Sequence, residues 1–184
     1  MTLQRLIYYL FGNNVVVGSH IRKQLDYLRK IVPDDFKHRD THDLGCGDGK
    51  ITIILKDIFK PSKFKGYDIC PELVKRTNDK GIEAEVKDLG KGLPGGEMAI
   101  MWGVLHHLDD MEGCLQNIKK YYDYIFIREP LRGEHKDLLE LGHPMYENEL
   151  DKLISKTLPG AQVYTYHNAM FIFYHNHNSQ NQSD

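Results

Sequence analysis

Apolar residues recur at helical spacing in the first part of the chain. From Ser19 to Ile31 they fall three or four positions apart behind a serine that can cap a helix, and Pro33 stops the pattern. A shorter apolar pattern at residues 3–11 predicts another helix. We therefore expect residues 1–39 to form an N-terminal helical segment that caps the same domain as the rest of the chain.

The pattern changes beyond residue 39, where short apolar runs alternate with amphipathic helical segments. This alternation is typical of a parallel α/β sheet with helices on both faces. The predicted strands span residues 39–44, 64–69, 83–87, 97–102 and 123–129. The predicted helices span residues 48–59, 71–80, 109–120 and 146–158. The first strand has the weakest pattern, because residues 39–42 are more polar than a central buried strand should be.

Two more strands are predicted near the end of the chain. Residues 162–166 and 169–174 flank His167-Asn168, which indicates an antiparallel hairpin at the edge of the sheet. Residues 176–184 are polar and predict a flexible tail. The fold class is thus a single α/β domain with a mostly parallel, seven-stranded sheet and a core at residues 40–175.

Composition and charge narrow the classes of protein. With 184 residues, 41% of them hydrophobic, the chain can build one core. The net charge of −2 argues against a nucleic-acid partner. However, residues 1–39 hold seven Lys/Arg and three Asp/Glu, a net of +4. Neither a secretion signal nor a membrane-length apolar stretch is present, so we expect no membrane partner.

Three cysteines, Cys46, Cys70 and Cys114, match neither zinc-site nor disulfide spacing. They suit a reducing compartment, which predicts a cytoplasmic protein. His175-Asn176-His177 superficially resembles a metal-binding pair, but it lies in the polar tail, and we expect no metal site. The sequence carries no signal for the oligomeric state.

A glycine-rich turn, Asp43-Leu44-Gly45-Cys46-Gly47-Asp48-Gly49, lies between the first predicted strand and the following helix. Successive glycines let a backbone turn tightly and approach a ligand closely, and the helix start offers free N–H groups. The spacing is G-x-G-x-G rather than the G-x-G-x-x-G of dinucleotide binders. An acid two positions before the first glycine would repel a pyrophosphate but attract an ammonium group.

Two further acids follow the next two strands. Asp68 ends Lys65-Gly66-Tyr67-Asp68, where a carboxylate can accept hydrogen bonds from both ribose hydroxyls, or can simply cap the helix ahead of Pro71. Asp88 follows the third strand at a position suited to an adenine amino group, or is a solvated loop acid. Three acids after three successive strands favour a nucleoside ligand with an amino-acid end.

With these motifs the chain resembles the class I S-adenosylmethionine-dependent methyltransferases over residues 40–174, and most of all their small-molecule branch, typified by quinone-biosynthesis enzymes. DLGCGDG (43–49), GYDI (66–69) and KDL (87–89) resemble three family motifs, and WGVLHHLDD (102–110) resembles the segment beneath the sulfonium. His42 departs from the aliphatic residue usual there. The resemblance implies a Rossmann-like fold and S-adenosyl-L-methionine as cofactor.

The resemblance also implies roles for individual residues. The glycines would contact the methionine part, Asp43 its ammonium, Asp68 the ribose and Asp88 the adenine amino group. The residues expected to bind the cofactor are Asp43, Gly45, Cys46, Gly47, Gly49, Asp68, Ile69, Asp88, Leu89 and Trp102. Trp102 packs against the cofactor or fills the core, and Cys46 is interpreted as a small turn residue rather than a nucleophile.

His106 and His107 are the candidate catalytic residues, because they follow a strand at the face where α/β sheets bind ligands. Either could act as a general base, or could only cap the backbone or shape the pocket. Residues 131–145, which follow Glu129-Pro130 and contain Arg132, His135 and His143, are candidates for acceptor recognition together with residues 1–39.

The predicted reaction is in-line transfer of a methyl group to a small-molecule acceptor, which needs mainly positioning. Two rival hypotheses remain. One is an RNA or protein methyltransferase that docks through the basic N-terminal segment, for which salt-dependent binding would be diagnostic. The other is a non-catalytic partner subunit that keeps the cofactor fold. A nicotinamide dehydrogenase is disfavoured by Asp43 and the glycine spacing.

Overall fold

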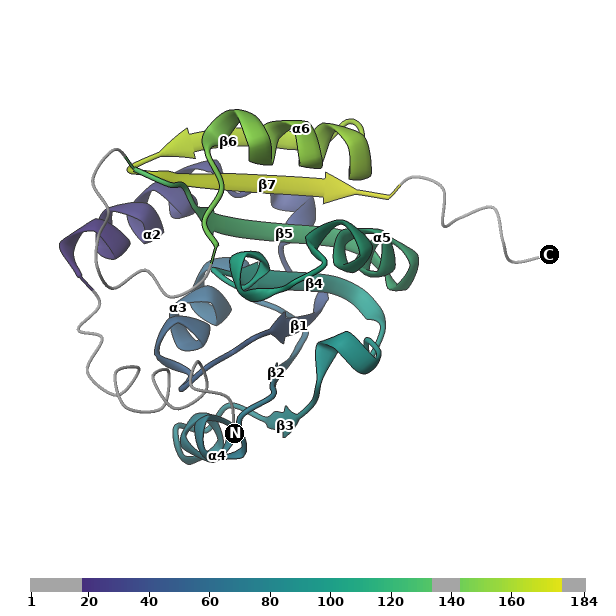
Figure 1. Cartoon of the computed structure of the whole chain (residues 1–184). Helices are drawn as coiled ribbons and strands as arrows, with labels where there is room; N and C mark the ends of the chain where they lie inside the picture. The colour runs from purple at the N-terminus through teal and green to yellow at the C-terminus, as the bar shows by residue number, and fades with distance from the viewer. Residues whose placement is uncertain (1–17, 134–142, 177–184) are drawn as a thin grey trace.

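The computed structural model describes residues 18–133 and 143–176, in which a seven-stranded sheet lies between layers of helices (Figure 1). The strand order is β3-β2-β1-β4-β5-β7-β6. The strands are β1 (Asp40–Leu44), β2 (Lys63–Asp68), β3 (Ala84–Val86), β4 (Gly96–Trp102), β5 (Tyr122–Pro130), β6 (Gln162–Tyr166) and β7 (Ala169–His175). The predicted helix at residues 3–11, most of the predicted tail and His135 lie outside the described residues.

The first five strands are parallel, and β7 runs antiparallel to both β5 and β6. His167 and Asn168 join β6 to β7 with φ angles of 46° and 56°. Positive φ at two successive loop residues is the geometry of the tight hairpin turns that match strand twist. The predicted mostly parallel sheet with a C-terminal antiparallel hairpin is confirmed.

Helices cover both faces of the sheet, as expected. The helices are α2 (Ser19–Ile31), α3 (Lys50–Phe59), α4 (Pro71–Asp79), α5 (Met111–Tyr121) and α6 (Glu147–Thr157), with short 3-10 turns η2 (Asp34–Phe36), η3 (Leu89–Lys91) and η4 (Leu105–His107). One buried cluster joins α2 and α3 to one face of the sheet. A second cluster joins α5 and α6 to the other face, so alternate side chains of the central strands are buried on opposite sides.

The N-terminal segment packs into the first of these clusters. Leu25 and Leu28 of α2 and Phe36 of η2 are buried there with aromatic side chains of β5 and β7, including Phe126 and Phe171. The helix predicted from residue 19 to 31 therefore has its apolar stripe against the sheet. The division of the chain into residues 1–39, 40–175 and 176–184 stays a prediction.

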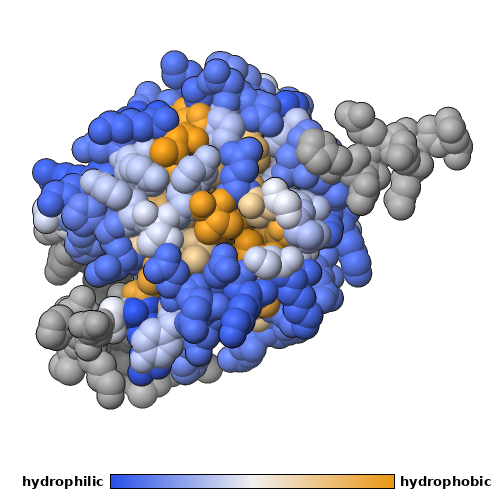
Figure 2. All heavy atoms as spheres, turned by 90° about the horizontal axis from the view of Figure 1, so that it is seen from above, coloured by the Kyte–Doolittle hydropathy of each residue, from blue (hydrophilic) through white to orange (hydrophobic). Residues whose placement is uncertain are grey.

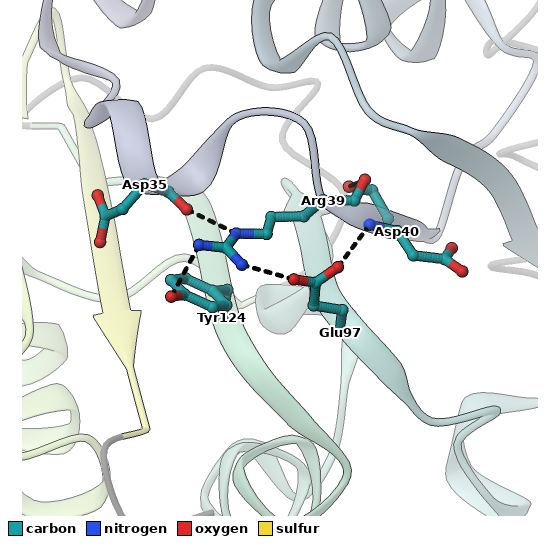
Figure 3. A network of polar contacts seen from close by, with 6 residues as sticks. Asp35, Arg39, Asp40, Glu97 and Tyr124 are labelled. Carbon is teal, nitrogen blue, oxygen red and sulfur yellow. Dashed lines mark hydrogen bonds and ion pairs between the residues drawn. The ribbon is translucent and has the colours of Figure 1, made fainter. Parts of the chain in front are cut away.

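A polar network ties the same segment to the amino ends of the strands (Figure 3). Arg39 donates to Glu97 Oε1 at 2.6 Å, to the Tyr124 hydroxyl at 3.0 Å and to the Asp35 carbonyl at 2.8 Å. Glu97 Oε2 in turn accepts from the Asp40 N–H at 2.9 Å. The Arg39 guanidinium thus joins η2, β4 and β5, and Glu97 extends the network to β1. The network lies at the amino ends of the strands, whereas parallel α/β sheets bind ligands at the carboxyl ends.

The side of the molecule that carries β6 and α6 shows apolar atoms gathered in its middle, inside a hydrophilic rim (Figure 2). Val163 of β6 is partly buried and packs against the core cluster on the α5 and α6 face. Glu147 of α6 accepts a hydrogen bond from the Thr165 hydroxyl of β6 at 2.7 Å. The helix is therefore fastened to the strand at the edge of the sheet by both apolar and polar contacts.

His42 explains how a polar sequence forms the central strand β1. Its ring packs edge-on against Tyr67 and Tyr122, with centroids 5.1 and 5.8 Å apart, and Nδ1 lies 3.1 Å from the Tyr122 hydroxyl. A Cβ at Gly96 would lie 3.0 Å from His42 Cε1, so a glycine makes room for the ring. Aromatic contacts and one hydrogen bond replace the expected aliphatic packing.

Burial lowers the pKa of His42 below its ordinary value of 6.5. The folded protein therefore binds this proton less readily than the unfolded chain, and stability present above about pH 6.5 should fall as the pH decreases below it. We expect His42→Gln to reduce the loss of unfolding free energy between about pH 7.5 and about pH 5, measured by urea denaturation. His20→Gln, on the exposed side of α2, is the control; an identical pH dependence in all three proteins would contradict the assignment.

Candidate active site

The glycine turn connects β1 to α3, and packing accounts for two of its three glycines. Gly45, Gly47 and Gly49 all have positive φ, at 89°, 55° and 81°. A Cβ at Gly45 would lie 2.5 Å from a methyl of Val104, and one at Gly49 would lie 3.2 Å from the Thr77 Cα. A Cβ at Gly47 would meet nothing within 4 Å. Gly47 therefore faces open space, where a ligand can approach the backbone.

Asp68, at the end of β2, holds this turn in place. Its Oδ2 accepts from the Gly47 N–H and its Oδ1 from the Cys70 N–H, both at 2.9 Å. The residue is only 9% exposed, and burial raises the pKa of its carboxyl group. Each carboxylate oxygen can accept more than one hydrogen bond. Asp68 thus fastens the loop after β1 and the start of α4 while retaining acceptor sites for a ligand.

Asp43 lies beneath the turn and is 2% exposed. Its pKa is raised to about 7, mainly by burial and to a smaller extent by the Asp68 carboxylate, while a hydrogen bond from Thr52 acts in the opposite direction. Cys46 is also buried, and burial raises the pKa of its thiol. A protonated thiol is a poor nucleophile, which agrees with its interpretation as a turn residue.

The ends of β2 and β3 present apolar side chains beside Asp68. Ile69 is 41% exposed and Val86 is 48% exposed, so both apolar side chains offer surface that a ligand can cover. Asp88 caps the amino end of η3, where it accepts from the Gly90 N–H at 3.1 Å and pairs with Lys91 at 3.4 Å. Leu89 is partly buried against the core. Open backbone at Gly47, a carboxylate at Asp68 and two exposed apolar walls fit a nucleoside with an amino-acid end.

Trp102 ends β4 and lies on the α2 face of the sheet. Its ring packs edge-on against Phe171, with centroids 6.3 Å apart, and the Arg128 guanidinium carbon lies 5.1 Å from the ring centroid. The glycine turn contacts the chain two residues further on, at Val104. The structure therefore places the Trp102 ring against the buried cluster on the face of the sheet that α2 covers.

Glu129, at the carboxyl end of β5, organises the exit of β4. Its Oε1 accepts from the N–H groups of Val104 and Leu105, both at 2.8 Å, and Oε2 accepts from the His106 N–H at 3.3 Å. His106 Nδ1 lies 2.7 Å from the same Oε2. Glu129 is 2% exposed. A buried carboxylate that accepts from Nδ1 leaves Nε2 of a neutral imidazole with its lone pair available.

His107 differs from its neighbour. Its ring centroid lies 3.9 Å from that of His106. Burial and the neighbouring His106 together lower its pKa to about 4. His107 is therefore neutral near pH 7 and a weaker base than an ordinary histidine. The geometry separates the two histidines that the sequence left equivalent.

Arg132 and His143 belong to residues 131–145, which were expected to recognise the acceptor. Arg132 N donates to the Met145 carbonyl at 2.9 Å, and the Arg132 guanidinium lies over the Tyr146 ring, 5.0 Å from its centroid. His143 N donates to the His106 carbonyl at 2.7 Å. Of the residues expected near the acceptor, Arg132 therefore lies just after β5, and His143 is bonded to the exit of β4.

Sequence reasoning did not identify the partners that hold these groups. It located Glu129 only by its strand end, and it missed Arg128, Gln24 and Val86. Gln24 and Arg128 are bonded although 104 positions separate them, and no local pattern reveals such a pair. Alternation along β5 could have placed Arg128 and Glu129 on opposite faces.

Two kinds of feature are absent from residues 18–133 and 143–176. In these ranges no helix is both long and apolar enough to cross a membrane. Within the same ranges no group of three or more His, Cys, Asp or Glu side chains could hold a metal ion. His175 instead stacks on Tyr124, with ring centroids 4.1 Å apart.

Comparison with known proteins defines the class. A family model described as a methyltransferase domain matches residues 19–158. The chain is 29% identical over 68 residues to trans-aconitate 2-methyltransferase of Mycobacterium sp. (strain KMS), a match that covers 37% of this chain and 26% of that protein. This chain therefore spans about a quarter of the length of that relative.

Solved structures agree on the fold. A possible histamine N-methyltransferase from Thermotoga maritima superposes with a TM-score of 0.72 and 14% identity, covering 94% of this chain and 99% of the other. Magnesium protoporphyrin IX methyltransferase from Synechocystis PCC 6803 with bound S-adenosylhomocysteine has a TM-score of 0.65 and 14% identity, covering 92% and 90%. The chain belongs to the methyltransferase domain family. It has the fold of the S-adenosylmethionine-dependent methyltransferases, and the Synechocystis enzyme of that fold contains S-adenosylhomocysteine in one structure and S-adenosylmethionine in another.

Asp68→Ala should weaken the binding of S-adenosylhomocysteine by roughly 2 to 4 kcal/mol, since each hydrogen bond to a charged group contributes about 1.5 to 3 kcal/mol. Calorimetric titration measures the change, with Asp79→Ala at the exposed end of α4 as control. If a folded Asp68→Ala protein keeps the wild-type dissociation constant, Asp68 only positions the turn.

Cofactor affinity should depend on pH through Asp43, whose pKa is about 7. If its carboxylate faces the ammonium of the cofactor, binding must release the proton, so the dissociation constant for S-adenosylhomocysteine should rise by up to about tenfold per pH unit below pH 7. In Asp43→Asn the dissociation constant should change less with pH. The change that remains should come from Asp68, the other carboxyl group facing the site. A slope that survives unchanged in Asp43→Asn would exclude Asp43 as its source.

Proposed function

We propose that this protein transfers a methyl group from S-adenosylmethionine to the hydroxyl oxygen of a small-molecule acceptor. The observation that carries the proposal is the His106–Glu129 pair, with 2.7 Å between Nδ1 and Oε2 at the exit of β4. The three named similar proteins support a small acceptor, because trans-aconitate, histamine and a porphyrin are all small molecules. The resemblance to the quinone-biosynthesis branch stays a prediction.

The chain holds the cofactor with groups from its first three strands. Asp43 and the open backbone at Gly47 take the methionine end, Asp68 takes the ribose hydroxyls, and Asp88 takes the adenine amino group. Ile69, Val86 and Leu89 supply apolar surface for the adenine ring. When bound, S-adenosylmethionine supplies an electrophilic methyl group on a sulfonium sulfur.

His106 serves as the general base in this proposal. Glu129 accepts from Nδ1 and so fixes the tautomer in which Nε2 can take the hydroxyl proton of the acceptor. The acceptor oxygen forms a bond to the methyl carbon, the carbon–sulfur bond breaks, and its electron pair stays on the sulfur of S-adenosylhomocysteine. His107, with a pKa of about 4, acts as a wall of the pocket and supports the ring of His106.

The acceptor is proposed to bind where three parts of the chain converge. These are the exit of β4 at residues 102–107, the exit of β5 at Glu129, and the N-terminal segment, of which residues 1–17 lie outside the described part. Gln24 of α2 reaches this region, since its side chain contacts Arg128 of β5 at 2.6 Å.

The direct test is to incubate the enzyme and methyl-labelled S-adenosylmethionine with small-molecule and macromolecular fractions of a cell extract. Label confined to macromolecules would overturn the small-acceptor assignment.

A macromolecular acceptor is the second candidate. Arg22, Lys23 and Lys30 lie on the exposed side of α2, where they could contact the phosphates of RNA. RNA binding that weakens steeply with salt, together with transfer of label to RNA, would favour it. Cofactor binding without transfer to either fraction would indicate a non-catalytic subunit.

We also propose a cytoplasmic location. Cys46, Cys70 and Cys114 are all free thiols in the structure, and free cysteines are typical of a reducing compartment. Their state in protein isolated from its source, measured by thiol labelling, tests this proposal.

His106→Ala should reduce kcat by about 100-fold or more while leaving the affinity for S-adenosylhomocysteine nearly unchanged, because the base acts only in the transition state. His107→Ala is the matched neighbour and should lose less activity. Equal losses in the two variants, or a loss in cofactor affinity as large as the loss in kcat, would remove the distinction between base and pocket wall.

A further inference from the structure

The two edge strands of the sheet, β3 and β6, differ in how their outer backbone groups are satisfied (Figure 1). At β3, the Asn78 side chain covers the outer side of Ala84. Its Nδ2 donates to the Ala84 carbonyl at 3.0 Å, and its Oδ1 accepts from the Ala84 N–H at 2.9 Å. Native proteins commonly cover edge strands, because unpaired N–H and C=O groups attract another strand. A side chain therefore closes the β3 edge at Ala84.

The β6 edge is open. The tight turn at the end of β6 makes Tyr166 a hydrogen-bonded partner of β7, and bonding then alternates along an antiparallel ladder. The N–H and C=O groups of Val163 and Thr165 therefore point away from the sheet. No protein group within residues 18–133 and 143–176 bonds to them. These groups are already in extended geometry, so they can pair with a further strand.

A groove lies beside this edge, between β6 and α6. Its walls are Val163, Thr165 and Met170 of the strands and Glu147, Asn148 and Asp151 of the helix. Met170 is buried and Val163 partly buried, whereas Glu147 and Asp151 are exposed, in keeping with the apolar centre and hydrophilic rim in Figure 2. A lysine or arginine suits such a groove, because its aliphatic stem can cover apolar surface while its charged end reaches the carboxylates.

The opposite face of β6 is aromatic. Tyr166 stacks on Tyr27 of α2, with ring centroids 4.3 Å apart, and Tyr164 packs edge-on against Phe173, with centroids 6.2 Å apart. Lys23 is exposed one turn before Tyr27 on the same side of α2. This face therefore favours uncharged aromatic or β-branched side chains over further cations. A strand added at the edge would meet carboxylates on one face and tyrosines on the other.

We propose that the β6 edge docks an extended segment of a partner protein in which lysine or arginine alternates with uncharged aromatic or β-branched residues. The segment pairs antiparallel with β6 through the backbone of Val163 and Thr165, and its cations point toward Glu147 and Asp151. A second copy of this chain fits less well. Antiparallel pairing of two β6 strands about a twofold axis would set the carboxylates of α6 against their own counterparts. The proposal does not depend on the proposed function.

The probe is the acetylated and amidated peptide Lys-Thr-Lys-Tyr-Lys-Thr-Lys, titrated calorimetrically into the full chain. It should bind saturably. The isomer Lys-Lys-Thr-Tyr-Thr-Lys-Lys, with the same charge but no alternation, should bind at least about tenfold more weakly. The lysines of the antiparallel segment would bond to β6, so methylating the backbone nitrogens of the two inner lysines should abolish binding. Methylating those of the two threonines should not.

Variants of the protein test the site from the other side. Thr165→Pro removes an outward N–H, which an edge strand tolerates, and should abolish binding of the alternating peptide. Asp151→Lys reverses one charge of the groove and should weaken binding by about three- to tenfold. Asp79→Lys, an exposed acid at the end of α4, is the matched control and should bind as the wild type does.

Several outcomes would overturn the proposal. These are no saturable binding of the alternating peptide, equal binding of its isomer, or undiminished binding by folded Thr165→Pro. If Thr165→Pro does not fold, equal affinities of Asp151→Lys and Asp79→Lys would overturn it instead. Sedimentation of the protein alone tests the rival occupant, because a dimer that Thr165→Pro converts to a monomer would assign the edge to a second copy.

Discussion

The geometry of the candidate active site depends on one buried carboxylate, that of Glu129. Three consecutive N–H groups after β4 donate to it, and it also orients the His106 imidazole. Backbone amides in a loop that leaves a parallel sheet have no strand partner, and burying them unsatisfied would cost free energy. Glu129 satisfies them from the neighbouring strand, so the chain can turn sharply at Gly103 and still present His106 at a fixed position.

Asp68 plays a parallel part on the other side of β1. It stands at the end of β2 and accepts from the Gly47 amide in the loop that follows β1. In both places an acid at the end of one strand fixes the loop that follows the adjacent strand. The two loops lie where the strand order reverses between β1 and β4, the position at which open α/β sheets bind ligands. Asp68 and Glu129 therefore fix the loops of the candidate site with carboxylates that can also interact with a ligand.

Much of the fold could be predicted because it follows from local patterns. Alternating strands and helices, the glycine turn and the His167-Asn168 hairpin are all encoded over a few residues. The strand with the weakest pattern, at His42, was predicted correctly, but it is stabilised by contacts outside its own sequence. Tyr67, Tyr122 and Gly96 make room for the His42 ring. The contact between Gln24 and Arg128 and the bonds to Glu129 join distant segments. Only the folded chain brings those groups together. One sequence could therefore suggest where the site lies but not which hydrogen bonds hold its side chains.

The hairpin turn connects the C-terminal edge of the sheet to the side proposed to bind the acceptor. The His167 carbonyl holds Gln24, and the Asn168 carbonyl accepts from the Leu131 N–H at 2.8 Å. The groups proposed to hold the cofactor come from β1 to β3, whereas those of the proposed acceptor side come from β4, β5 and α2, and this turn contacts α2 and the end of β5. A change in the length of the hairpin would therefore shift Gln24 and Leu131 on the proposed acceptor side, while the groups proposed to hold the methyl donor, on β1 to β3, would keep their positions.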